Sequence, residues 1–297
     1  MQKLIATMIA AGTLAVSPSP ATAQDAAARA AAVLAEAREA LGGDERLRAV
    51  TTLQAAGDFR RVLGEMQMEG ELELLLEPPD KLRKNEDISM PGGARMTRTE
   101  VVNGAEVWDD SGQRGGMGHG VAIVMRGPGG ANADPAQVKE MQRRMRRAEL
   151  ARYAAAWLLA FDGAATHAGI AEAPDGRADV IEIAPAEGPP IRLFIDQATH
   201  LPLMLTWQGP QPRIMVRRQA GPPSDGEQAR EAAAAEESGP PPQATFEMRL
   251  ADYREVSGVR LPHQISKAVN GQTNEEWTIA AYEVNPSLRS NTFTKQP

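Results

Sequence analysis

Apolar and polar residues alternate, with one exception, over residues 65–77, which read EMQMEGELELLLE. One parity holds the apolar residues and a glycine: Met66, Met68, Gly70, Leu72, Leu74 and Leu76. The other parity holds glutamates and one glutamine, with Leu75 as the apolar exception. Because successive side chains of a β-strand point to opposite faces, this period of two predicts a strand with one buried and one solvated face. Such strands are typical of an antiparallel sheet that is covered on one side.

Turn signals at short spacing predict that further strands follow as hairpins. Pro78-Pro79-Asp80 ends the alternating strand, and Asn103-Gly104 is a strong signal for a two-residue hairpin. Similar dipeptides recur at Asp175-Gly176, Ser257-Gly258 and Asn270-Gly271. With the apolar runs between them, these signals predict about ten or eleven strands.

The region before the strands is predicted to be helical. Residues 25–41 are rich in alanine, leucine, glutamate and arginine, which are strong helix formers. Gly42-Gly43 ends this helix, because glycine tolerates the left-handed conformation of a C-cap. Asp44 is then suited to cap a short second helical piece that runs to Ala49.

A second long helix is predicted in the middle of the chain. Asp134 is its expected N-cap, Pro135 occupies its first turn, and its pattern extends to Phe161. Its apolar stripe changes direction along the length, so we expect the segment to be kinked, split in two, or buried on different sides at its two ends.

The start of the chain has the features of a secretory signal peptide. Lys3 precedes an apolar stretch, and Ala21-Thr22-Ala23 forms a small-residue cleavage site before Gln24. The alternative is a buried N-terminal helix. The apolar stretch is too short to span a membrane. We therefore predict a signal peptide at 1–23, a single domain at 24–297, and a periplasmic location.

Composition narrows the possible functions. The formal net charge of the 297 residues is -7, and only 4% are aromatic, which argues against nucleic-acid binding. There is no cysteine, so neither disulfides nor a lipidated cysteine are available, and burial has to stabilise the fold. Residues 221–243 form a charged, proline-bounded insert that is predicted to be disordered.

Catalytic chemistry finds little support in the sequence. The four histidines are His119, His167, His200 and His263. None stands at a metal-ligand spacing, and no nucleophile lies in an elbow motif. We therefore predict no metal, no cofactor and no enzyme activity. A histidine and an acid that converge in the fold would be the sign of an enzyme.

Two groups of residues are candidates for binding. The first would line an apolar ligand cavity, since methionine adapts to varied apolar ligands. This set comprises Met66, Met68, Leu72, Leu74, Leu76, Met204 and Met248. The second is the basic run of the mid-chain helix, which is suited to anionic lipid headgroups or an acidic partner. It comprises Arg143, Arg144, Arg146 and Arg147. The alternatives are an ordinary packed core for the first set and a solvated helix face for the second.

Segments spread over residues 25–297 resemble the LolA/LolB-like family of periplasmic lipoprotein carriers and sorting proteins. They are ALGGDERLRAVTTLQAAG, GELELLLEPPDKLRK, EVVNGAEVWD, YREVSGVRLPHQI and VNPSLRSNTFTKQP. The resemblance implies a mainly β (α+β) fold: an incomplete antiparallel barrel, or half-barrel, with the two helical segments over its mouth. In the carriers this fold encloses a hydrophobic cavity that receives acyl chains.

The resemblance also implies a function. A protein of this kind binds a lipid, an acyl chain or a lipoprotein. Some relatives of the fold instead bind a protein partner or sense envelope stress, and a filled interior would favour that alternative. The carriers have a gating arginine just before the proline that ends the long strand, whereas Glu77 stands at the matching place here.

Overall fold

The computed structural model describes residues 20–64, 66–89, 93, 95–114, 121–125, 134–159, 163–174, 176–211, 214–218 and 242–295. The helices are α1 (Pro20–Ala40), α2 (Asp44–Ala49) and α3 (Pro135–Ala156). The strands are β1 (Leu53–Leu63), β2 (Met66–Glu77), β3 (Lys81–Ser89), β4 (Arg95–Asn103), β5 (Glu106–Arg114), β6 (Val121–Met125), β7 (Gly163–Ala173), β8 (Gly176–Pro185), β9 (Ile191–Asp196), β10 (Pro202–Pro210), β11 (Ile214–Arg218), β12 (Gln243–Val256), β13 (Val259–Val269) and β14 (Gln272–Val284).

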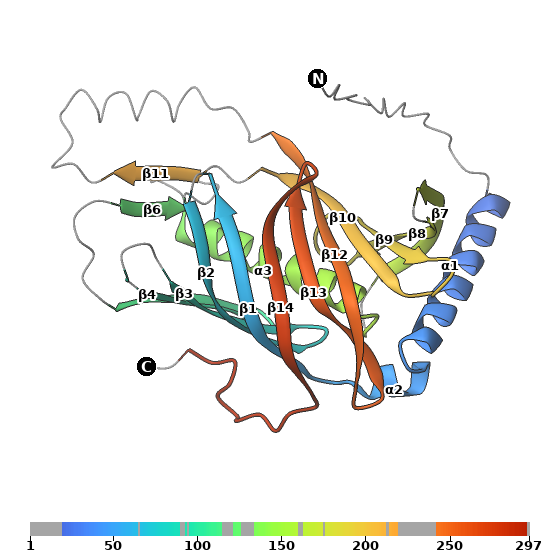
Figure 1. Ribbon diagram of the computed structural model, residues 1–297, viewed down its shortest axis with the longest axis horizontal. Coiled ribbons are helices and arrows are strands. Elements are labelled where there is room, and N and C mark those ends of the chain that lie inside the picture. Colours follow the sequence, from blue (N-terminus) through green and yellow to red (C-terminus); the bar gives the residue numbers. More distant parts are fainter. Residues whose placement is uncertain are drawn as a thin grey trace, which may run out of the picture.

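Twelve strands form one antiparallel sheet in the order β5-β4-β3-β2-β1-β14-β13-β12-β10-β9-β8-β7 (Figure 1). Its two edge strands, β5 and β7, do not pair with each other, so the sheet is an unclosed half-barrel, as predicted. β6 and β11 form a separate two-stranded ribbon. The prediction of ten or eleven strands was too low. It did not include β7, which is rich in alanine and glycine and shows little apolar alternation, or the short strands β6 and β11.

The hairpin signals are confirmed by the pairing of neighbouring strands. β4 pairs with β5 across Asn103-Gly104, and β13 pairs with β14 across Asn270-Gly271. Asn270 and Gly271 have φ angles of 50° and 78°. Positive φ at both central residues is the geometry that matches the twist of a two-residue hairpin.

α3 is one continuous helix that lies on one side of the sheet (Figure 1). Asp134 caps it as predicted, since its side chain accepts a hydrogen bond from the backbone N–H of Ala136 at 2.9 Å. The first half of α3 is mainly exposed, whereas its last residues are buried. The apolar stripe was predicted to change direction along this segment. In the structure the segment is one helix, with its first half solvated and its second half packed.

α1 lies along the edge strand β7 (Figure 1). Its buried residues in the described chain are Ala30, Val33 and Ala37, all of which follow the predicted cleavage site. The helix itself already begins at Pro20. The cap of α2 differs from the prediction: Gly43 is the N-cap, and Asp44 instead pairs with Arg38 at 2.7 Å.

The main core lies between the inner face of the sheet, α1 and the second half of α3. A second, smaller core lies on the outer face, where Leu75, Val101 and Phe293 are buried together. Phe293 belongs to the segment after β14, and its backbone carbonyl accepts a hydrogen bond from Trp108 Nε1 at 3.3 Å. The C-terminal segment thus covers Leu75, which explains the apolar exception on the polar face of β2.

Most of the predicted insert 221–243 lies outside the described residues, as does the predicted signal sequence up to residue 19. The described part of the insert begins at Pro242, whose carbonyl accepts a hydrogen bond from the backbone N–H of Gln211 at 2.8 Å. Among the described helices, none is long and apolar enough to cross a membrane.

Candidate functional site

The residues predicted to line a cavity lie mainly in the packed interior. The inner face of β2 carries Met68, Leu72, Leu74 and Leu76, which are at most 3% exposed, and Met248 of β12 is 2% exposed. Met66 is partly buried and packs against the same core. In this structure these side chains contact protein neighbours, and contact with a ligand stays a prediction.

Met204 is placed differently from the rest of that set. It lies opposite Arg249, whereas Leu205 lies opposite Met248. Since directly opposed residues share a face, Leu205 and Met248 point inward and Met204 points to the outer face. The run LPLML is apolar at consecutive positions, so its sequence does not reveal which parity faces the core.

The four arginines of α3 do not form one surface. Arg146 points inward, where its side chain is 12% exposed and pairs with Glu100 of β4. Arg143 pairs with Glu187 of the β8–β9 loop at 2.9 Å, and Arg147 pairs with the same carboxylate at 3.5 Å. Arg144 is the most exposed of the four, with 69% of its side chain accessible.

Charged residues occupy part of the inner face, which sequence reasoning missed. Along β3 the buried positions are Leu82, Lys84, Glu86 and Ile88, so two charges alternate with two apolar residues on the face that points inward. Leu82 and Ile88 are apolar and lie on the same face of β3 as Lys84 and Glu86. This spacing of two could have predicted that Lys84 and Glu86 point inward.

The first ionic cluster joins α3 to β3 and β4. Lys84 Nζ lies 2.7 Å from Glu100 Oε2 and 3.1 Å from Glu149 Oε1. Arg98 and Arg146 also pair with Glu100. Burial alone would raise the pKa of the Glu100 carboxyl, but the charges of Lys84 and Arg146 outweigh it and hold that pKa below its usual range. Glu100 is therefore charged at neutral pH.

A second ionic cluster lies beside the first on β1, β3, β13 and β14. The Arg61 guanidinium bridges Glu86 at 2.6 Å and Glu275 at 2.7 Å. Lys267 Nζ lies 3.3 Å from Glu275 Oε1 and 3.6 Å from the ring centroid of Trp277. Burial would raise the pKa of Glu275, but Lys267 and Arg61 hold it below its usual range.

Aromatic rings attach the second half of α3 to the sheet. Tyr153 stacks on Trp157 at 5.5 Å and on Trp277 of β14 at 5.9 Å between ring centroids. Arg152 lies over the ring of Trp207 on β10, with its Cζ 4.5 Å from the centroid. This end of the helix is thus fixed by ring packing, whereas its first half is attached through side-chain charges.

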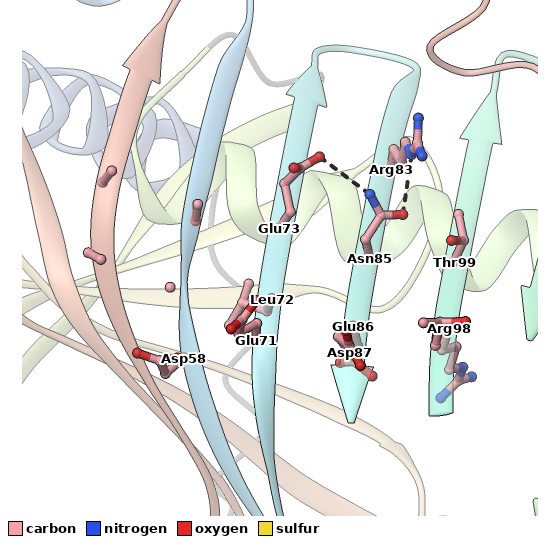
Figure 2. Close-up of a pocket in the computed structure, with 15 residues that line it drawn as sticks. Asp58, Glu71, Leu72, Glu73, Arg83, Asn85, Glu86, Asp87, Arg98 and Thr99 are labelled. Atoms are coloured by element: carbon pink, nitrogen blue, oxygen red, sulfur yellow. Dashed lines mark hydrogen bonds between the residues drawn. The ribbon is translucent and has the colours of Figure 1, made fainter. Parts of the chain in front are cut away.

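The outer face carries a polar recess of about 540 Å³, drawn in Figure 2. Asp58, Glu71 and Asp87 are direct cross-strand neighbours within it. Asn85 donates to Glu73 at 3.3 Å and accepts from Arg83 at 3.2 Å. The described residues contain no group of acids, histidines or cysteines arranged to hold a metal ion. The charged lining does not suit an acyl chain.

A histidine and an acid do converge in the fold. His167 Nε2 lies 2.7 Å from Asp179 Oδ1, and the same carboxylate accepts hydrogen bonds from Arg29 at 3.3 Å and Gln197 at 2.9 Å. Within the part of the chain that the structure describes, no hydroxyl is hydrogen-bonded to His167. Because Arg29 belongs to α1, this cluster attaches α1 to β7 and β8.

The other described histidines have structural contacts. His263 is buried, and its Nδ1 lies 2.7 Å from the carbonyl oxygen of Ile279. His200 Nδ1 lies 3.5 Å from Glu36 of α1. His119 lies outside the described residues.

Comparison with known proteins gives remote structural likenesses. No family model and no curated protein matches the chain. It is similar to a LolA superfamily protein from Nitrosomonas europaea, with 11% identity, a TM-score of 0.46, and coverage of 90% of this chain and 97% of that one. A putative outer membrane lipoprotein-sorting protein domain from Vibrio parahaemolyticus gives 12% identity, a TM-score of 0.44, and coverage of 90% and 97%.

The MucA/MucB complex from Pseudomonas aeruginosa is a weaker match. It gives 14% identity and a TM-score of 0.22, with coverage of 87% of this chain and 93% of that one.

Proposed function

We propose that this chain is a non-catalytic binding protein of the cell envelope that takes up an acyl chain or a similar lipid between the inner face of the sheet and α3. The observation that carries the proposal is that the two halves of α3 are attached differently to the inner face of the sheet, which is partly apolar and partly charged. Its second half is packed, with Leu150 and Tyr153 at most 1% exposed. Its first half is attached by ion pairs, of which Lys139–Glu106 is exposed and Arg143–Glu187 is half-buried.

Surface ion pairs contribute little to stability, because water replaces them at small cost. The first half of α3 is therefore the part of the cover that separates most easily from the sheet. In this proposal, separation gives a ligand a way to the leucine and methionine side chains of β2, β10 and β12, and each methylene that is buried against them contributes about 0.8 kcal/mol. The free energy gained by burying a long acyl chain offsets the free energy lost when the contacts of the helix are broken.

The proposal includes export to the periplasm, with the signal peptide removed after Ala23. The buried residues of α1 begin at Ala30 in the described chain, so cleavage after Ala23 leaves every described contact of the core in place. The lipid, acyl chain or lipoprotein that fills the interior is the expected partner.

A cross-link between α3 and the β8–β9 loop tests the proposal without altering the core. The chain has no cysteine, so Arg143→Cys with Glu187→Cys provides a unique pair for a short bismaleimide. The matched control is Glu140→Cys with Arg144→Cys, a pair within α3. A fluorescent fatty acid is titrated into the mature protein, purified without detergent, before and after bridging.

We expect bridging of the first pair to weaken binding of the fatty acid at least about tenfold, which is 1.4 kcal/mol, and bridging within α3 to leave it unchanged. Unchanged binding after both bridges would contradict uptake beneath α3. Absence of binding by the folded, unbridged protein would refute the lipid proposal itself.

A protein-binding module is the second candidate, and the packed interior favours it. Five of the seven residues predicted to line the cavity are at most 3% exposed, so the fold in this conformation is complete without a ligand. Lipid extraction of the mature protein followed by mass spectrometry separates the two candidates, since this second one predicts no co-purified lipid.

A further inference from the structure

Arg152 differs from the other cations that lie between α3 and the sheet. Arg61, Lys84, Arg146 and Lys267 each lie within ion-pair distance of a carboxylate. Within the described part of the chain, the guanidinium of Arg152 has no carboxylate at that distance and no hydrogen-bond acceptor; its contact is with the face of Trp207. It is thus a partly buried cation whose N–H groups donate no hydrogen bond to the described protein.

The surface next to Arg152 is aromatic and leads into the apolar interior. Trp207 of β10 stacks on Phe246 of β12, with ring centroids 5.6 Å apart and planes 7° from parallel. Both rings are partly buried. Trp207 lies opposite Phe246 in the sheet, and the next inward-pointing pair is Leu205 with Met248. A cation on α3 therefore lies over a flat aromatic surface of β10 and β12, and an aliphatic surface follows along the same two strands.

Partial burial of the Arg152 guanidinium without an ion pair is costly for the folded protein. Desolvation lowers the pKa of the Arg152 guanidinium, and the charge of the Glu149 carboxylate opposes only part of this effect; arginine remains charged at neutral pH. The cation–π contact with Trp207 offsets part of the desolvation but satisfies none of the N–H donors. A carboxylate or a phosphate satisfies two of them at once, because the guanidinium fork matches the spacing of their oxygens.

We propose that Arg152, Trp207 and Phe246 form the headgroup site for an anionic amphiphile. A carboxylate or phosphate pairs with the Arg152 guanidinium, the first methylenes lie against the Trp207–Phe246 stack, and the chain continues toward Leu205 and Met248. The inference rests on the proposed function, and it adds the chemical class of the headgroup and the residue that selects it.

The test compares ligands that differ only in the headgroup. Oleate, oleyl alcohol and oleoyl lysophosphatidate are titrated by calorimetry into the mature wild-type protein and into Arg152→Gln, Arg152→Lys and Arg144→Gln. Arg144 is the matched control, because it is an exposed arginine on the same helix. We expect Arg152→Gln to weaken binding of the preferred anion about tenfold or more and to leave oleyl alcohol unchanged. Arg152→Lys should restore part of the loss, and Arg144→Gln should resemble the wild type.

The outcomes separate the two proposals. Dependence on Arg152 for oleate identifies a carboxylate ligand, and dependence for lysophosphatidate identifies a phosphate ligand; either supports the headgroup site. Equal effects of Arg152→Gln on an anion and on the alcohol overturn the headgroup site but leave lipid binding standing. Binding of none of the three ligands by the wild type overturns both proposals.

Thermal unfolding of Arg152→Met provides a readout that does not depend on a ligand. If the guanidinium is reserved for an anion, replacing it with an apolar side chain of similar length leaves the melting temperature equal or higher. A clear decrease would show that Arg152 stabilises the fold through Trp207, which contradicts a binding role.

Discussion

Glu100→Gln is the most informative single change in the buried charge network. The Glu100 side chain is 2% exposed and pairs with Lys84, Arg98 and Arg146. The substitution keeps the shape of the side chain but removes the charge that compensates these cations. Breaking a buried ion pair by removing one partner costs about 3 to 5 kcal/mol, because the remaining charge stays buried without compensation.

That loss is large for a chain of this size. At about 2 to 4 °C per kcal/mol, the melting temperature should fall by roughly 6 to 20 °C. Circular dichroism during heating, and urea unfolding at constant temperature, measure the loss. The matched control is Glu71→Gln, an exposed carboxylate on the outer face of β2, which should change stability by less than about 0.5 kcal/mol.

The effect should also depend on pH with a definite sign. The folded pKa of Glu100 lies below its ordinary value of 4.5, so its contribution is complete above that pH and disappears as the pH falls through the lowered pKa. The difference in melting temperature between wild type and Glu100→Gln should therefore be full at pH 7 and smaller at pH 3. An equal difference at both values, or no difference at pH 7, would refute the assignment of Glu100 as a buried, charged partner.

Three further predictions concern other parts of the chain. Phe293→Ala should lower the free energy of unfolding by about 3 kcal/mol, because it uncovers Leu75 and Val101, while Arg289→Ala should have little effect; urea midpoints compare the two. Replacing residues 221–241 with a short Gly/Ser turn should leave the melting temperature within a few degrees, since loop-closure cost changes slowly with length, and loss of a cooperative transition would show that the segment packs. Intact-mass measurement of the exported protein should find Gln24 as the first residue, and a product that retains the apolar leader would contradict this.

Local sequence patterns determined much of the fold. The period of two in β2 correctly predicted its inward face, because a strand alternates whatever sheet it joins. Asn103-Gly104 and Asn270-Gly271 correctly predicted hairpins, since the backbone conformation of such turns favours those residues. The cap at Asp134 follows from hydrogen bonding within a few residues.

Other features depended on which distant segments meet. The sequence shows Leu75 only as an exception, and its burial requires Phe293 to cross the outer face more than two hundred residues later. Lys84 and Glu86 share the inward parity of Leu82 and Ile88, but the sequence of β3 does not show which charges compensate them there. Glu149 of α3 pairs with Lys84, and Arg61 of β1 pairs with Glu86. These ion pairs join residues that are far apart in the sequence. A local pattern of apolar and polar residues therefore cannot identify the partners.

The candidate site shows the same division. Sequence reasoning identified most of the inward methionines and leucines, because they follow strand parity. It did not identify Arg152, Trp207 and Phe246 as neighbours, since their contacts join α3, β10 and β12. Helix and strand periodicity place each side chain on a face of its own element, whereas only the tertiary structure brings a guanidinium, without a carboxylate partner in the described chain, over an aromatic stack.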